Sequence, residues 1–108
     1  MITYNKLVRD KIIEKIESTW GTAHYHLANE AEFEQKLKEK LIEEAQELSK
    51  AKNLDEIQWE LADVLKITQE IMNYYHINED EINELIKQKD EKAGGFEKRI
   101  ILDEASVY

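Results

Sequence analysis

Residues 41–63, which read LIEEAQELSKAKNLDEIQWELAD, decide both the fold and the candidate chemistry of this chain. Two helical patterns meet in this stretch. When each residue is advanced by about 100° around a helix axis, Glu44 falls inside the apolar arc of the first pattern and Glu47 lies on its edge. Glu60 falls inside the apolar arc of the second pattern, and Asp63 flanks that arc. Each helix therefore offers a pair of carboxylates, three residues apart, on its core-facing side.

The helix starts share one signal along the chain. Asn29, Asp55 and Asn78 are each followed three residues later by Glu or Gln, which is the pattern of a capping box. Together with the spacing of apolar residues, this predicts a short first helix at roughly 5–18 and three further helices at roughly 30–52, 56–75 and 79–92.

The ends and links of these helices also have sequence signals. Gly21 is a candidate left-handed cap for the first helix, and Gly94-Gly95 closes the last one. Because residues 52–54 form a short link, we expect the two long helices to pack as an antiparallel hairpin. Residues 23–28 and 97–102 are candidates for a small two-stranded sheet.

The composition fits a helical protein. The 108 residues contain no proline and only three glycines, and 42% of them are hydrophobic. We therefore expect a mostly all-α fold, a four-helix bundle that forms one domain over residues 1–108. The apolar arcs of the two long helices consist of Phe33, Leu37, Leu41, Leu48 and Ala51, and of Ile57, Leu61, Val64, Ile67, Ile71 and Tyr75.

The charge excludes several classes of function. A net charge of −9 repels phosphate backbones, so we expect no nucleic-acid partner.

There is no cysteine for a disulfide or a zinc–thiolate site. No apolar run reaches the roughly 20 residues that span a bilayer, and the first residues do not resemble a secretory signal. We expect a cytoplasmic protein.

Inward carboxylates on two neighbouring helices need something to offset their repulsion. A hard divalent cation such as Mg²⁺ fits, because it prefers oxygen ligands and keeps positions for water and phosphate. A solvated acidic face is the alternative interpretation of each glutamate taken singly. A di-iron site is disfavoured because none of the three histidines lies three residues after a glutamate.

The same residues resemble a known family. Glu43-Glu44-Ala45-Gln46-Glu47, twelve further residues and Glu60-Leu61-Ala62-Asp63 resemble the EExxE…ExxD signature of the MazG-like nucleotide pyrophosphohydrolases, the all-α NTP pyrophosphatase superfamily. The opening YNKLVRDKI and the late GGFEKRI are similar to a small branch that is labelled phosphoribosyl-ATP pyrophosphohydrolase-like.

The resemblance implies an activity and a site. It implies an α-helical dimer or tetramer that uses Mg²⁺, with Mn²⁺ as an alternative, to hydrolyse a nucleoside triphosphate between the α and β phosphates, which would suit removal of unwanted nucleotides. Its implied metal ligands are Glu44, Glu47, Glu60 and Asp63. Its implied catalytic residues are Glu43 and Glu44, with Glu43 as a further ligand, a supporting group or a base.

The resemblance also implies cations that bind the substrate phosphates. Lys6 and Arg9 belong to the first flanking motif, and Lys92 and Arg99 lie around the second. Enzymes of histidine synthesis in this family commonly carry a histidine shortly after the aspartate, whereas Asp63 is followed here by Val64 and Leu65. We therefore expect a substrate other than that of histidine synthesis. The alternative function is a non-catalytic helical module that binds a nucleotide or a protein.

Overall fold

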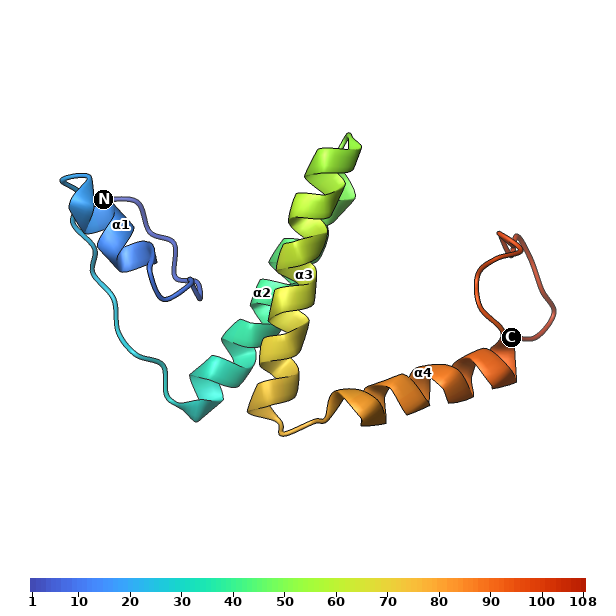
Figure 1. Ribbon diagram of the computed structural model, residues 1–108. Helices are drawn as coiled ribbons and strands as arrows, with labels where there is room; N and C mark the ends of the chain where they lie inside the picture. Colours follow the sequence, from blue (N-terminus) through green and yellow to red (C-terminus); the bar gives the residue numbers. More distant parts are fainter.

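The computed structural model describes all 108 residues and contains four helices and no strand (Figure 1). The expectation of a mostly all-α protein with four helices is confirmed, whereas the small sheet does not form. Figure 1 shows why: residues 23–28 connect the first two helices on one side of the molecule, while residues 97–102 follow the last helix on the other side. The four helices are α1 (Ile12–Ser18), α2 (Glu30–Lys50), α3 (Leu54–Tyr74) and α4 (Glu79–Ala93).

The helices α2 and α3 form the predicted antiparallel hairpin, and they are the only pair that packs extensively. The only two buried residues are Leu37 of α2 and Ile67 of α3, one on each helix of this pair. Near the open end of the hairpin, the ring of Phe33 meets the ring of Tyr74 edge-on, with 5.4 Å between centroids. The core that positions the site is thus one helix–helix contact.

The cap of α3 differs from the prediction. Asn53, not Asp55, is the N-cap, and its side-chain oxygen accepts a hydrogen bond from the Glu56 amide at 2.9 Å. Glu56 in turn accepts from the Lys52 amide at 2.8 Å. Asp55 lies in the first helical turn instead, where a carboxylate stabilises the helix through its interaction with the helix dipole. The predicted caps Asn29 and Asn78 are confirmed.

The first helix is shorter than predicted. It begins at Ile12 rather than near residue 5, because Asn5 has a left-handed backbone (φ 48°) and its carbonyl oxygen accepts a hydrogen bond from Lys36 of α2 at 2.8 Å. Residues 5–11 form an irregular segment that lies against the hairpin. Contacts to a distant helix outweigh a weak local helical preference here, since a short isolated helix has little stability of its own.

The end of α1 also corrects the prediction. Trp20, not Gly21, takes the left-handed conformation (φ 64°). The Gly21 amide donates to the Ile16 carbonyl at 3.0 Å, which is the longer hydrogen bond of a Schellman motif. A Cβ at Gly21 would lie 2.7 Å from Ile16 Cγ2. Glycine is therefore needed here because the backbone passes close to Ile16, and not because of a positive φ. At the end of α4, Gly94 closes the helix as predicted, with φ 84°.

The chain is far more open than a folded monomer of its size. Its radius of gyration is 18.5 Å, whereas a compact domain of about 100 residues has about 13 Å. Figure 1 shows α4 leaving the hairpin at its base and leading away from it. The four helices are present, but within one chain only α2 and α3 pack together, so they do not form the expected four-helix bundle. None of the helices is both long and apolar enough to cross a bilayer.

The predicted apolar arc of α3 divides into two faces. Ile67 is buried and Val64 and Ile71 are half-buried, whereas Ile57 and Leu61 are exposed. A single partner helix covers only part of so wide an arc. The uncovered residues follow one stripe along α3 at helical spacing: Leu54, Ile57, Leu61 and Leu65.

Candidate active site

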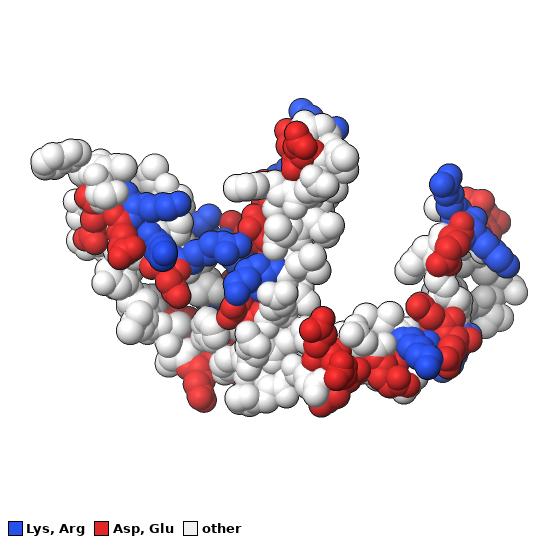
Figure 2. Space-filling view, viewed as in Figure 1, with Lys and Arg blue, Asp and Glu red and all other residues white.

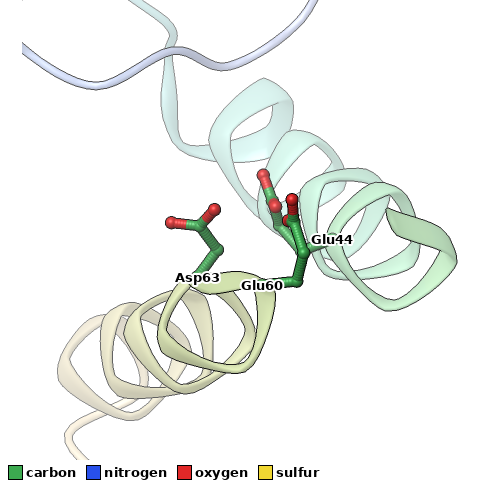
Figure 3. Close-up of side chains that lie close together, drawn as sticks. All are labelled: Glu44, Glu60 and Asp63. Atoms are coloured by element: carbon green, nitrogen blue, oxygen red, sulfur yellow. The ribbon is translucent and has the colours of Figure 1, made fainter. Parts of the chain in front are cut away.

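The antiparallel hairpin brings carboxylates from both long helices together. Glu44 of α2 faces Glu60 and Asp63 of α3, and one oxygen of each lies within 4.8 Å of the others (Figure 3). All three side chains are partly buried, and that of Glu44 is only 13% exposed. The helical periodicity that placed Glu44 and Glu60 within apolar arcs thus corresponds to a real cluster of acidic groups.

Glu47 lies outside this cluster of three. It is exposed, one turn beyond Glu44 on α2, and it is near enough that its charge contributes to a raised pKa at Glu60. Its role as a metal ligand stays a prediction. A change of side-chain rotamer would decide whether its carboxylate joins the other three.

The charges around Glu60 are unbalanced. Its pKa is raised above the ordinary value by burial and then by the neighbouring charges of Asp63, Glu47 and Glu44. Glu44 pairs with Lys40 at 3.3 Å and Asp63 pairs with Arg9 at 2.8 Å, whereas Glu60 has no cationic partner. A partly buried carboxylate that is repelled by its neighbours is stabilised when a cation binds among them.

The irregular N-terminal segment supplies cations to this site. Lys6 donates to Glu43 at 3.1 Å, and Arg9 donates to Asp63 at 2.8 Å. Figure 2 shows basic side chains gathered in the space between the N-terminal segment and the hairpin, beside acidic ones. Of the predicted phosphate-binding residues, Arg9 therefore contacts the carboxylate cluster, and Lys6 contacts Glu43 beside it.

Glu43 occupies a different environment from the cluster. Burial alone would raise its pKa, but hydrogen bonds and charges from Lys6 and Lys40 outweigh burial and lower the pKa below its ordinary value. Glu43 is therefore ionised at neutral pH and fixes two lysines beside the site. Its predicted catalytic role stays a prediction.

The other two predicted phosphate-binding residues are not brought to the cluster by this chain. Lys92 lies in the last turn of α4, and Arg99 lies in the loop that follows. Since α4 leads away from the hairpin, both are remote from Glu44 and Asp63 (Figure 1). Within a single chain they have no access to a substrate at the cluster.

Two basic residues at the site were missed by sequence reasoning. Lys36 and Lys40 of α2 lie on the face that carries Glu43 and Glu44, and their side chains are only 18% and 17% exposed. The signal was available, since Lys40 precedes Glu44 by four residues and Lys36 precedes Lys40 by four, which places all three on one face.

The donor set fits a hard divalent cation. Glu44, Glu60 and Asp63 offer only carboxylate oxygens, without histidine or cysteine, which favours Mg²⁺ or Mn²⁺ over zinc. Three carboxylates leave coordination positions for water and for phosphate oxygens. Helical proteins that bind metals in this way also gather carboxylates from facing helices.

Comparison with known proteins gives the family. The family model described as phosphoribosyl-ATP pyrophosphohydrolase matches residues 3–90, so the chain belongs to this family, which is part of the MazG-like all-α NTP pyrophosphatase superfamily. The family indicates a pyrophosphohydrolase that depends on a divalent metal and acts on a nucleotide-like substrate. The curated proteins and the solved structures gave no significant match. The matched range includes the carboxylate cluster with Lys6 and Arg9, and it ends before Lys92 and Arg99.

Proposed function

We propose that this protein is a Mg²⁺-dependent nucleoside triphosphate pyrophosphohydrolase that yields a nucleoside monophosphate and pyrophosphate. The observation that carries the proposal is the cluster of Glu44, Glu60 and Asp63 on facing helices, in a member of a pyrophosphohydrolase family. Removal of unwanted nucleotides is the role we propose for this activity.

The metal would be held by these three carboxylates, with Glu47 as a fourth candidate one turn away on α2. When bound, it would supply positive charge to the phosphate oxygens and to the leaving group. Repulsion between the carboxylates, which raises the pKa of Glu60, would be relieved at the same time.

The side chains of this protein have separate tasks in the proposed reaction. Lys6 and Arg9 bind phosphate oxygens beside the cluster, and Arg9, which contacts Asp63, orients the α-phosphate. A water oxygen forms a bond to the α-phosphorus, the bond from that phosphorus to the bridging oxygen breaks, and pyrophosphate leaves. The proton of the water passes to a carboxylate, for which Glu43 and Glu44 are the proposed acceptors.

We further propose that the protein works as a dimer or a dimer of dimers. A folded monomer of this mass exposes about 6,300 Å², whereas this chain exposes 10213 Å². The difference is roughly 3,900 Å² per chain, or about 7,800 Å² for two chains, which is ample for an obligate interface of about 2,000–5,000 Å² in total. An arm that leads away from its own hairpin also suits a neighbouring copy, which would receive Lys92 and Arg99 near its carboxylates.

The deciding experiment measures pyrophosphate release from a panel of nucleoside triphosphates and phosphoribosyl-ATP, with Mg²⁺ and with EDTA. We expect release from at least one triphosphate that requires Mg²⁺ and falls by more than about 100-fold in Glu44→Gln. The matched control is Glu91→Gln, which removes an exposed glutamate on α4 and leaves the cluster unchanged.

The other outcomes are informative as well. Release from phosphoribosyl-ATP alone would replace the proposed substrate and keep the reaction. No release from any substrate, with Mg²⁺ still raising the melting temperature, would favour a non-catalytic module that binds a nucleotide.

A further inference from the structure

A cavity of about 150 Å³ lies beside the carboxylate cluster, between the N-terminal segment and α2. Three of its lining side chains are lysines, and only one lining residue is hydrophobic. It adjoins the cluster because its lining residue Lys40 pairs with Glu44 at 3.3 Å. The cavity is lined by Asn5, Lys6, Leu7, Lys36, Glu39, Lys40 and Glu43.

The lysines of this cavity differ from an ordinary surface pair on the same hairpin. Lys66 of α3 pairs with Glu70 and is 51% exposed, whereas Lys36 and Lys40 are less than half as exposed. The order of the residues does not distinguish these pairs, since lysine precedes glutamate in all of them. The difference is that the cavity lysines are largely buried beside the carboxylate cluster.

The size and lining of the cavity define its ligand. A cavity of this size admits a group about as large as benzene, and small-molecule pockets that enclose a larger ligand usually exceed about 300 Å³. There is no aromatic side chain in the lining to stack on a base. Lysine ammonium groups bind phosphate oxygens as point charges. Glu39 and Glu43 also line the cavity and pair with these lysines, so the lining side chains carry a net charge of +1 (three lysines and two glutamates). A bound anion would therefore take the lysines from these pairs. The cavity suits a small oxyanion and not a nucleoside.

The positions of the two lysines along α2 indicate how a chain of phosphates would run from the carboxylate cluster. Lys40 contacts Glu44 of the cluster, and Lys36 lies four residues nearer the N-terminus of α2, a rise of about 6 Å. A chain of phosphates whose α-phosphate lies at the cluster would therefore pass Lys40 first and reach Lys36 last. The nucleoside would leave the cluster in another direction.

We propose that Lys36 and Lys40, together with Lys6, form the subsite for the β- and γ-phosphates, which leave as pyrophosphate. The proposal rests on the proposed function for the identity of the substrate, and it assigns two residues that the carboxylate signature does not include. Lys40 binds next to the bond that breaks, and Lys36 binds the terminal phosphate. The subsite thereby selects triphosphates over diphosphates.

The test measures binding of inorganic pyrophosphate and of inorganic phosphate by calorimetry in the presence of Mg²⁺, so that turnover is not required. We expect Lys36→Met and Lys40→Met each to weaken pyrophosphate binding about tenfold, as loss of one charged hydrogen bond predicts. Binding of a nucleoside monophosphate should change less than twofold in Lys36→Met. Lys36→Arg should restore most of the pyrophosphate affinity, because it keeps the charge.

Lys38→Met is the matched control, since Lys38 is exposed on the same helix and makes no ion pair. Equal weakening in Lys38→Met, or unchanged pyrophosphate affinity in both Lys36→Met and Lys40→Met, would overturn the subsite. Lys36 also holds the Asn5 carbonyl. A merely structural role would weaken pyrophosphate and monophosphate equally, and that result would overturn the proposal too.

Failure of the subsite is distinct from failure of the proposed function. If the unaltered protein does not bind pyrophosphate but releases it from a triphosphate in a Mg²⁺-dependent way, the subsite is wrong and the function stands. If it binds pyrophosphate through these lysines but turns over no triphosphate, the subsite stands as an anion site and the function is wrong.

Discussion

Arg9 and Asp63, 54 positions apart in the sequence, form a direct ion pair in which Arg9 Nη2 donates to Asp63 Oδ1 at 2.8 Å. The pair joins the irregular N-terminal segment to α3 at the edge of the carboxylate cluster. An arginine therefore neutralises one of the groups proposed to hold the metal. A cation bound at the proposed site would compete with this guanidinium for the same carboxylate, and Arg9 would then be free to bind a phosphate.

We predict that Arg9→Gln lowers the activity and leaves the free energy of unfolding nearly unchanged. Because Arg9 is largely exposed, its ion pair contributes no more than about 1 kcal/mol to the free energy of unfolding. The kcat/KM for the best triphosphate should fall about tenfold or more, through the lost phosphate contact. Affinity for Mg²⁺ should not fall, since a competing cation has been removed. Kinetics, chemical unfolding and calorimetric titration with Mg²⁺ measure the three quantities.

The control for Arg9 is Lys15→Gln, which removes an exposed cation from α1 that makes no ion pair. It should leave kcat/KM within about twofold, the range expected for a surface charge. A large loss of unfolding free energy in Arg9→Gln would mean that Arg9 is structural, and unchanged kcat/KM would remove it from the site.

The raised pKa of Glu60 predicts how stability depends on pH without metal. A carboxyl whose pKa is raised in the folded state contributes stability below its unfolded pKa, near 4.5, and loses that contribution as the pH rises through the folded value. Glu60→Gln should therefore melt at a higher temperature than the unaltered protein at pH 7 in EDTA. The difference should vanish toward pH 4. Thermal unfolding across this pH range measures it.

Addition of Mg²⁺ should reverse the order of the two proteins. A ligand that binds only the folded state raises its stability, and the unaltered protein retains the full set of carboxylates. At pH 7 with Mg²⁺ it should melt above Glu60→Gln. If Glu60→Gln melts lower than the unaltered protein in EDTA, Glu60 is not repelled by its neighbours as its surroundings indicate.

Leu37 is the best test of the hairpin core, since its side chain is 1% exposed. Leu37→Ala should lower the free energy of unfolding by about 2–5 kcal/mol, through lost burial and the cavity that remains. Urea unfolding at a fixed protein concentration measures the loss. The control is the exposed neighbour Lys38→Ala, which should change the value by less than about 0.5 kcal/mol. A loss below about 1 kcal/mol in Leu37→Ala would show that the hairpin contact is not the core.

The helical period, together with the short link at residues 52–54, was sufficient to predict the hairpin and all three members of the cluster. Glu44 and Glu60 lie on the faces where α2 and α3 meet, so their positions around each helix fixed their proximity once the helices packed. Asp63 follows from Glu60 by one turn. The start of α3 was misplaced because Asn53 and Asp55 both match the cap pattern, and only the structure distinguishes them.

The parts that could not be predicted depend on contacts between distant residues. The segment at residues 5–11 carries helical spacing, but Lys36 and Asp63 hold its backbone and side chains in another conformation. The direction of α4, and with it the location of Lys92 and Arg99, is set by no capping or periodicity signal. Local sequence signals specify that α4 is a helix. They do not specify its direction, because no other helix of the chain packs extensively against it.

The uncovered stripe of α3 predicts assembly into at least a dimer. Leu54, Ile57, Leu61 and Leu65 form an apolar stripe that the single chain leaves exposed, and exposed apolar surface of this extent marks an interaction site. Light scattering should therefore give a mass of at least twice 12.8 kDa.

A charge placed in the stripe should disrupt that assembly. Leu65→Glu buries a carboxylate without a partner wherever a second copy covers α3, so the mass should shift toward the monomer and the melting temperature should fall. Gln69→Glu adds the same charge at an exposed, polar position of the same helix and should leave the mass unchanged. If the unaltered protein has the monomer mass, or if Leu65→Glu keeps the dimer mass and melting temperature, the stripe is not an interface between copies of this chain.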